Sequence, residues 1–236
     1  MVTQWLVVAD TFRGFDHRAL AADLLADAAF RHIRPVVLGD AAGLPGALPY
    51  ADLPAFLKRV RETDTVAALA LEFTILNASR TSEVLQATRA EVDGDVWTIP
   101  AERMKAGKTH QVPLCQRSLQ ILEIAKSNDP KSRYLFSKNG KHLCNMAMLV
   151  LARRLSNGIT VHGFRSTFRD WVSEETDHSP EVAEMALAHT IGNKVEQAYR
   201  RGKLLERRRL LMNDWASYCK TGTWGNVLKL VERKSA

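Results

Sequence analysis

The sequence predicts an α+β domain that is mostly α-helical and carries a small three-stranded antiparallel sheet. Three observations lead to this prediction. Apolar residues recur at helical spacing through most of the chain after Pro49. An Asp-Gly-Asp turn sequence at 93–95 separates Val92 from an apolar run at 96–99, which predicts a hairpin. A short segment at 111–114 then predicts the third strand.

Residues 1–46 differ in composition from the rest of the chain. A stretch rich in alanine and leucine at 16–30 predicts a helix, and Pro35–Leu38 predicts a short strand. The run 39–46 is rich in glycine and ends in Pro-Gly, so it is the best candidate for a linker. We therefore expect an atypical N-terminal segment and linker over 1–46, and a main domain over 47–236.

The main domain is expected to open with two helices. Asp52 precedes Pro54, and a capping carboxylate followed by an early proline is typical of a helix start. Asp64 marks a second start, before apolar residues at helical spacing up to Leu76. Arg80 follows the end of that helix. Further helices are expected at about 82–88, 116–126, 144–155, 161–176, 180–188 and 204–219, and Ser179-Pro180 is a clear start signal for the fifth of these.

Charge is distributed unevenly along the chain, whose formal net charge is +7. Residues 1–100 contain 9 Lys and Arg against 13 Asp and Glu, a net of −4. Residues 101–236 contain 24 against 13, a net of +11. A basic C-terminal half favours a polyanionic partner, with nucleic acid first. A solvated basic surface is the alternative.

Several classes of protein are disfavoured by what the sequence lacks. The three cysteines are far apart and form no Cys-x-x-Cys, which argues against a disulfide framework or a zinc site and favours a reducing cytosol. No stretch approaches the roughly 20 apolar residues of a membrane span. Gly107-Lys-Thr109 resembles the end of a phosphate-binding loop, but Glu102 stands where the first glycine belongs. Without a His-Glu-x-x-His or paired carboxylates, neither a metal nor another cofactor is expected.

An ordered set of polar residues nevertheless has the parts needed to break and rejoin a phosphodiester. A phenol is a nucleophile, arginines bind phosphate, and lysine and histidine move protons. Each member alone also has an ordinary explanation, such as a surface ion pair, a helix cap or a packing residue. The set, in chain order, is Arg80, Lys105, His162, Arg165, His189 and Tyr199.

Two pairs within this region have informative spacing. Arg80 and Glu83 are three residues apart, so the carboxylate can orient the guanidinium from the same helix face. His162 and Arg165 have the same spacing near a predicted helix start, where free N–H groups favour anions. Both pairs suit the binding of a phosphate group.

Together these residues resemble the catalytic domain of the tyrosine recombinases, the phage integrase family, and within it the integrases of genomic islands and satellite prophages. The resemblance covers roughly residues 48–220. It is carried by the stretches 78–84, 97–107, 110–114, 161–171, 181–189 and 199–201.

The resemblance implies a role for each residue of the set. Arg80 and Arg165 would hold the non-bridging oxygens of the scissile phosphate, with Glu83 supporting Arg80. Lys105 would protonate the leaving 5′ oxygen, and His189 would hydrogen-bond the phosphorane. His162 would accept the proton of Tyr199, which would form a 3′-phosphotyrosyl link. Contacts with DNA are expected from Arg103, Lys108, Arg200 and Arg201.

The function implied is site-specific DNA recombination, for integration or excision of a mobile element such as a prophage. The expected partners are double-stranded DNA attachment sites and further copies of the chain, as a tetramer on DNA, in the bacterial cytoplasm at the nucleoid. A remnant that binds DNA without completing recombination and a type IB topoisomerase-like activity are the alternatives. Family members carry an arm-binding and a core-binding domain ahead of the catalytic one. Residues 1–46 resemble neither and are not expected to form a complete core-binding domain. The chain therefore resembles an isolated catalytic domain or a truncated remnant.

The segment after Tyr199 is expected to form an apolar stripe on its helix. Two locations are open for this stripe: a neighbouring protomer, as often in the family, or the chain's own domain. Its members are Leu204, Leu205, Leu211, Trp215 and Tyr218.

Overall fold

The computed structural model describes residues 5–9, 11–12, 15–16, 34–38, 46–189 and 201–224, with side chains over 46–189 and 204–224. The chain divides into two compact units, Met1–Ala42 and Gly43–Ala236.

Two small strand pairs are described in the first unit. The strand predicted at 35–38 is present as β4 (Arg34–Leu38), which pairs in parallel with β1 (Trp5–Ala9). β2 (Thr11–Phe12) pairs antiparallel with β3 (Phe15–Asp16). The predicted helix over 16–30 lies outside the described residues, except for Asp16 in β3.

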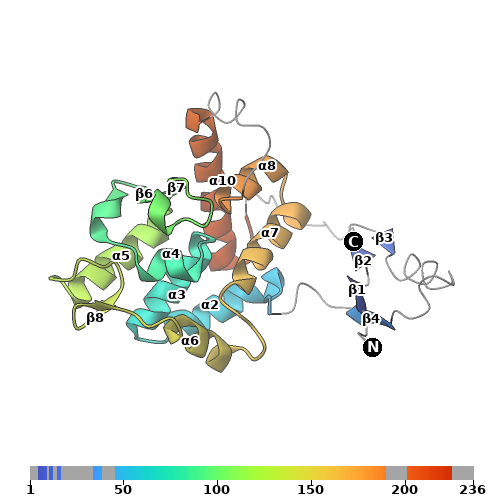
Figure 1. Ribbon diagram of the computed structural model, residues 1–236, viewed down its shortest axis with the longest axis horizontal. Helices are drawn as coiled ribbons and strands as arrows, with labels where there is room; N and C mark the ends of the chain where they lie inside the picture. Colours follow the sequence, from blue (N-terminus) through green and yellow to red (C-terminus); the bar gives the residue numbers. More distant parts are fainter. Residues whose placement is uncertain are drawn as a thin grey trace, which may run out of the picture. The chain divides into compact units, whose positions relative to one another are not determined.

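The second unit is mostly helical and contains a three-stranded antiparallel sheet (Figure 1). The sheet has the order β5 (Val92–Asp93), β6 (Val96–Ile99), β7 (His110–Pro113), and β6 pairs with β7 from Val96 opposite Pro113 to Ile99 opposite His110. The predicted fold class is therefore confirmed. The helices are α2 (Leu53–Arg61), α3 (Val66–Leu76), α4 (Thr81–Leu85), α5 (Gln116–Asn128), α6 (Ala147–Leu155), α7 (Gly163–Glu175), α8 (Pro180–Ala186) and α10 (Arg201–Thr221), with short 3₁₀ turns η2 (Tyr50–Asp52), η3 (Arg89–Glu91) and η4 (Ala101–Arg103).

Helix starts were predicted with mixed success. Ser179 caps α8, because its hydroxyl accepts a hydrogen bond from the backbone N–H of Val182. The start assigned to Asp64 was wrong by one residue. Thr65 is the cap, and its Oγ1 accepts from the N–H of Ala68 at 3.2 Å. A second small hairpin, β8 (Ser137–Lys138) with β9 (Lys141–His142), was not predicted.

Helix α3 lies at the centre of the unit and contacts α2, α5, α6 and α10. It is apolar on all sides, as expected of a helix that is surrounded by protein. Its one buried carboxylate, Glu72, accepts hydrogen bonds from Arg61 at 2.7 Å and from Arg117 at 2.9 and 2.8 Å. These partners are necessary, because burying a charge without a partner lowers the free energy of unfolding by roughly several kcal/mol.

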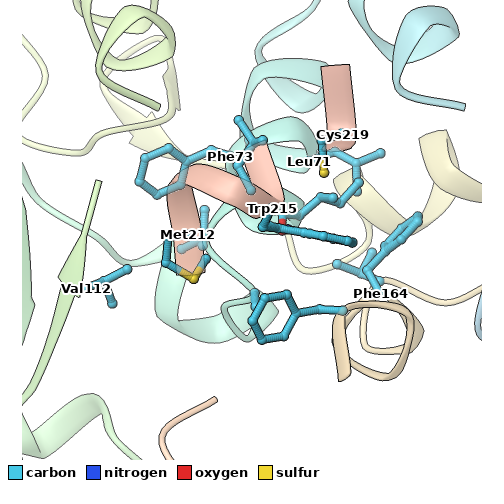
Figure 2. Close-up of a cluster of buried hydrophobic side chains, with 14 of the residues drawn as sticks. Leu71, Phe73, Val112, Phe164, Met212, Trp215 and Cys219 are labelled. Carbon is cyan, nitrogen blue, oxygen red and sulfur yellow. The ribbon is translucent and has the colours of Figure 1, made fainter. Parts of the chain in front are cut away.

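Helix α10 packs on its own domain. Trp215 is fully buried, its Nε1 donates to the carbonyl of Ile75 at 2.9 Å, and its ring centroid lies 5.0 Å from that of Trp171. Figure 2 shows Met212, Trp215 and Cys219 of α10 among side chains of α3, β7 and α7. Of the two locations open for the apolar stripe, the structure therefore shows the chain's own domain, with Leu204, Leu211, Trp215 and Tyr218 buried and Leu205 half-buried.

Polar contacts add to the attachment of α10 and α8 to the sheet. Arg208 of α10 is buried, and its Nη1 donates to the carbonyl of Gln111 in β7 at 2.6 Å. His110 in β7 hydrogen-bonds the backbone of Ala186, the last residue of α8. Burial, and then the charge of Arg208, lower the pKa of His110 to about 4, so this imidazole is neutral at pH 7.

We expect Trp215→Ala to reduce the free energy of unfolding by about 3–5 kcal/mol, because it removes a large side chain from the core. Leu210→Ala is the matched control, since Leu210 lies on the same helix and is 62% exposed. Its effect should stay within about 0.5 kcal/mol. Urea denaturation of both variants measures the difference, and equal losses would contradict the packing of α10 described above.

The lowered pKa of His110 predicts a pH-dependent stability. Because the unfolded imidazole binds a proton more readily than the folded one, stability is lost as the pH falls below about 6.5 and on towards 4. The loss assigned to His110 is up to roughly 3 kcal/mol. Urea denaturation at several pH values should show a shallower loss in His110→Gln than in the unsubstituted chain, and parallel curves would contradict it.

Candidate functional site

The first part of the site is the turn that follows α3. Asn77 ends the helix, and its Nδ2 donates to the carbonyl of Phe73 at 2.7 Å. Ala78 then adopts the left-handed conformation, with φ +47°, which is uncommon for a residue other than glycine. The turn reverses the chain and delivers Arg80 to the start of α4.

Arg80 and Glu83 make the contact that their spacing predicted. The backbone N–H of Arg80 donates to Oε2 of Glu83 at 2.8 Å, and Nη1 of Arg80 donates to Oε1 at 2.7 Å. Glu83 is buried, whereas the Arg80 side chain is half-buried. One carboxylate therefore caps α4 and holds the guanidinium of Arg80 at the edge of the protein.

Arg165 lies in the first turn of α7 and is 5% exposed. Its Nη1 donates to the carbonyl of Ala78, and Nη2 donates to the carbonyl of Leu187 at 2.6 Å. Nη2 also lies 3.2 Å from Nε2 of His189. Burial, and then the charge of Arg80, lower the pKa of Arg165 to about 10, so the guanidinium keeps its charge at pH 7.

His162 immediately precedes α7, and its position depends on the glycine that follows it. A Cβ at Gly163 would lie 2.0 Å from the carbonyl oxygen of Gly46, so only glycine fits there. The pKa of His162 is lowered by partial burial and then by the charges of Arg165, Arg80, His189 and Lys105. The imidazole is therefore mainly neutral at pH 7 and able to accept a proton.

The same electrostatic contacts show that five predicted residues converge. Each of the other four acts on the His162 imidazole, although they come from α4, α7, the end of α8 and the loop between β6 and β7. Lys105 is exposed on that loop, next to the buried Met104. The structure thus brings together Arg80, Lys105, His162, Arg165 and His189.

His189 follows α8 through a turn at Ala188, which has φ +52°. Its backbone N–H donates to the carbonyl of Glu184 at 2.9 Å, and its Nδ1 lies 2.6 Å from Oε2 of Glu184. Oε1 of Glu184 accepts from Nε of Arg169 at 2.6 Å. Burial alone would raise the pKa of Glu184, but hydrogen bonds from His189 and Arg169 lower it overall.

The remaining predicted residues divide into three cases. Tyr199 and Arg200 lie outside the described residues, as does the side chain of Arg201, where α10 begins. Lys108 is exposed on the loop that carries Lys105. Arg103 donates through Nη1 to the carbonyl of Glu83 at 2.7 Å and forms an ion pair with Glu91. Its contact with DNA stays a prediction.

Sequence reasoning missed the residues that support the site. Glu91 accepts from Trp97 Nε1 at 3.0 Å as well as from Arg103, so it joins β6 to η4, and Arg103 also donates to the carbonyl of Glu83. Glu184 was also missed. The available signal was its place five residues before His189, a separation that a left-handed turn at a helix end brings into contact.

The described residues contain neither a membrane-spanning helix nor a cluster of metal ligands. No helix among them is long and apolar enough to cross a membrane. Within the same residues, no three or more His, Cys, Asp or Glu side chains are grouped as they would be to hold a metal ion.

Comparison with known sequences gives consistent matches. A family model described as the phage integrase family matches residues 48–204. The chain is 33% identical over 161 residues to prophage integrase IntA of Escherichia coli (strain K12), covering 65% of this chain and 39% of that protein. It is 31% identical over 177 residues to prophage integrase IntZ of the same organism, covering 72% and 44%. The chain therefore spans less than half the length of these relatives.

Solved structures show the same fold. The integrase from mycobacterium phage Brujita matches with a TM-score of 0.54 and 15% identity, covering 83% of this chain and 67% of that chain. XerA recombinase matches with a TM-score of 0.50 and 14% identity, covering 70% and 66%. A lambda integrase dimer bound to a COC′ core site matches with a TM-score of 0.50 and 17% identity, covering 79% and 56%.

The electrostatic environment of His162 yields a prediction. Its pKa should lie below the usual value of about 6.5, and Arg80→Met should raise it by removing one of the positive charges nearby. Titration of the His162 ring signals by NMR measures both values. Arg209→Met, which removes a charge on α10, is the control, and an equal shift in both variants would contradict the proximity of Arg80.

Proposed function

This chain belongs to the phage integrase family, and we propose that it breaks and rejoins double-stranded DNA through a covalent tyrosyl intermediate. The observation that carries the proposal is the clustering of four cationic or proton-transferring groups around the His162 imidazole, two of which, Arg165 and His189, also contact each other. Four different parts of the fold contribute to this cluster, and a phosphate is the ligand that such a cluster suits.

Two arginines would bind the scissile phosphate in the proposed reaction. Guanidinium groups form paired hydrogen bonds with phosphate oxygens. Both arginines are already held in place before a phosphate binds. Arg80 is held by Glu83, and Arg165 by backbone carbonyls. Preset donors of this kind stabilise the additional negative charge of a phosphorane without having to reorganise.

The proton transfers follow from the same geometry. A phenol has a pKa near about 10 and needs a base at neutral pH. His162 is mainly neutral and would accept the proton of Tyr199 as its oxygen attacks phosphorus. The bond to the 5′ oxygen breaks, and Lys105 would supply the proton that this oxygen takes. His189 would donate a hydrogen bond to the phosphorane.

The intermediate is a 3′-phosphotyrosyl ester with a free 5′ hydroxyl. Attack by a 5′ hydroxyl reverses the step, returns the proton to Tyr199 and restores a phosphodiester. Because the ester conserves the energy of the original bond, neither a nucleotide cofactor nor a metal is required by this scheme.

We propose that Lys108, Arg200 and Arg201 contact DNA phosphates beside the site. Arg103 would have to share its guanidinium between a phosphate, Glu83 and Glu91, so we propose it as a supporting residue. Integration or excision at attachment sites, assembly as a tetramer on DNA and location at the bacterial nucleoid belong to the same proposal. The names of the prophage integrases that the chain resembles support the integration or excision in this proposal.

Covalent trapping tests the proposed reaction. A nicked duplex that covers the attachment site beside the gene should give an SDS-resistant protein–DNA band. Cleavage near the nick releases a short strand that carries the free 5′ hydroxyl. Once this strand has diffused away, the phosphotyrosyl bond cannot be reversed. Tyr199→Phe should abolish the band and keep DNA binding within about a factor of three, since only one hydroxyl is lost.

Other outcomes would point to other functions. A band that persists in Tyr199→Phe would mean that another residue is the nucleophile. DNA binding with no band would favour a remnant that no longer recombines. Relaxation of a supercoiled plasmid with no strand transfer between two attachment sites would favour a topoisomerase-like activity.

A further inference from the structure

A chain of hydrogen bonds extends from Arg169 through Glu184 and His189 to Arg165. Arg169 Nε lies 2.6 Å from Glu184 Oε1, and His189 Nδ1 lies 2.6 Å from Glu184 Oε2. Arg165 Nη2 lies 3.2 Å from His189 Nε2. Both nitrogens of the His189 ring therefore have a defined partner, although the side chain is 46% exposed.

The chemistry of these partners fixes the hydrogens on the ring. An ionised carboxylate can only accept a hydrogen bond, so Nδ1 of His189 carries a hydrogen directed at Glu184. A guanidinium can only donate, so Nε2 carries none while it accepts from Arg165. In the free protein, the neutral His189 ring is thus held as the Nδ1–H tautomer.

This arrangement determines what His189 can do for an anion beside Arg165. Such an anion can accept the hydrogen bond from Arg165 in place of Nε2. If Nε2 takes a proton from solvent, it becomes a donor to the same anion, while Nδ1–H stays on Glu184. The carboxylate compensates the charge of the resulting imidazolium, as in other histidines paired with an acid.

We propose that Glu184 is a positioning residue, which fixes the ring orientation and tautomer of His189 so that Nε2 faces the anion held by Arg165. Arg169 in turn fixes Glu184. The inference rests on the proposed function for its catalytic consequence. The turn at Ala188 supports it independently, because the backbone carbonyl of Glu184 also accepts from the N–H of His189.

A purely structural role is the alternative, since the ion pair between Arg169 and Glu184 also joins α7 to α8. A structural role would change stability. It would have no reason to change the protonation pattern of one imidazole, so the tautomer of His189 distinguishes the two roles.

The first measurement therefore uses the free protein and no DNA. NMR of the ¹⁵N-labelled imidazole, assigned through loss of the signals in His189→Gln, should show the Nδ1–H tautomer in the unsubstituted chain. Glu184→Ala should shift the population towards Nε2–H, and Arg169→Met should do so less strongly. Glu123→Gln, which removes a negative charge from the exposed face of α5, should change nothing.

The second measurement is the rate of covalent trapping at saturating nicked DNA. Glu184→Ala should lower this rate by about tenfold to a hundredfold, by analogy with the loss of a partner that orients a metal-bound histidine. The Kd for DNA should stay within about a factor of three. Glu184→Gln, which keeps an acceptor oxygen, should fall between Glu184→Ala and the unsubstituted chain, and it serves as the working variant if Glu184→Ala does not fold.

The outcomes separate this inference from the proposed function. An unchanged tautomer in the Glu184 variants would overturn the positioning role, whatever the trapping assay shows. A changed tautomer with an unchanged trapping rate would overturn its catalytic consequence. Absence of trapping in the unsubstituted chain would contradict the proposed function, and the tautomer measurement would still decide whether Glu184 positions His189.

Discussion

The buried guanidinium of Arg165 is the constraint on which the rest of the site depends. A charge inside a protein is tolerated only where hydrogen bonds replace the water it has lost. Arg165 obtains them from Ala78, Leu187 and His189, which lie at the ends of α3 and α8. Satisfying one cation therefore fixes two helix ends relative to α7, and each end carries the next functional group of the site.

Two carboxylates hold side chains of this cluster in place by hydrogen bonds. Glu83 holds Arg80 and is itself supported through Arg103 and Glu91, and Glu184 holds His189. Each acid fixes one side chain of the site, and on the far side of His189 the ring nitrogen Nε2 lies 3.2 Å from Nη2 of Arg165. Partial burial, and then the positive charges of this cluster, lower the pKa of His162 and keep that imidazole mainly neutral at pH 7.

Local signals allowed much of the fold, and part of the site, to be predicted from the sequence. The turn at 93–95, the cap at Ser179 and the apolar run of α3 are local features, so the sequence displays them directly. The β8–β9 hairpin was missed because its strands have two residues each and show no alternation. Glu184 and the protein partners of Arg103 were missed because these contacts depend on groups brought close by folding or by a turn, and a charge in a sequence does not show its partner.

Arg80 and Arg165 differ in burial, so they would act at different stages of ligand binding. Arg80 is half-buried and Lys105 is exposed, so their fields extend into solvent, where they can speed the approach of a polyanion and where added salt weakens them. Arg165 is shielded by protein, so salt would screen its interaction with a phosphate much less. For the proposed DNA substrate, the outer cations would therefore govern the association rate, and the buried one would govern how long a phosphate stays.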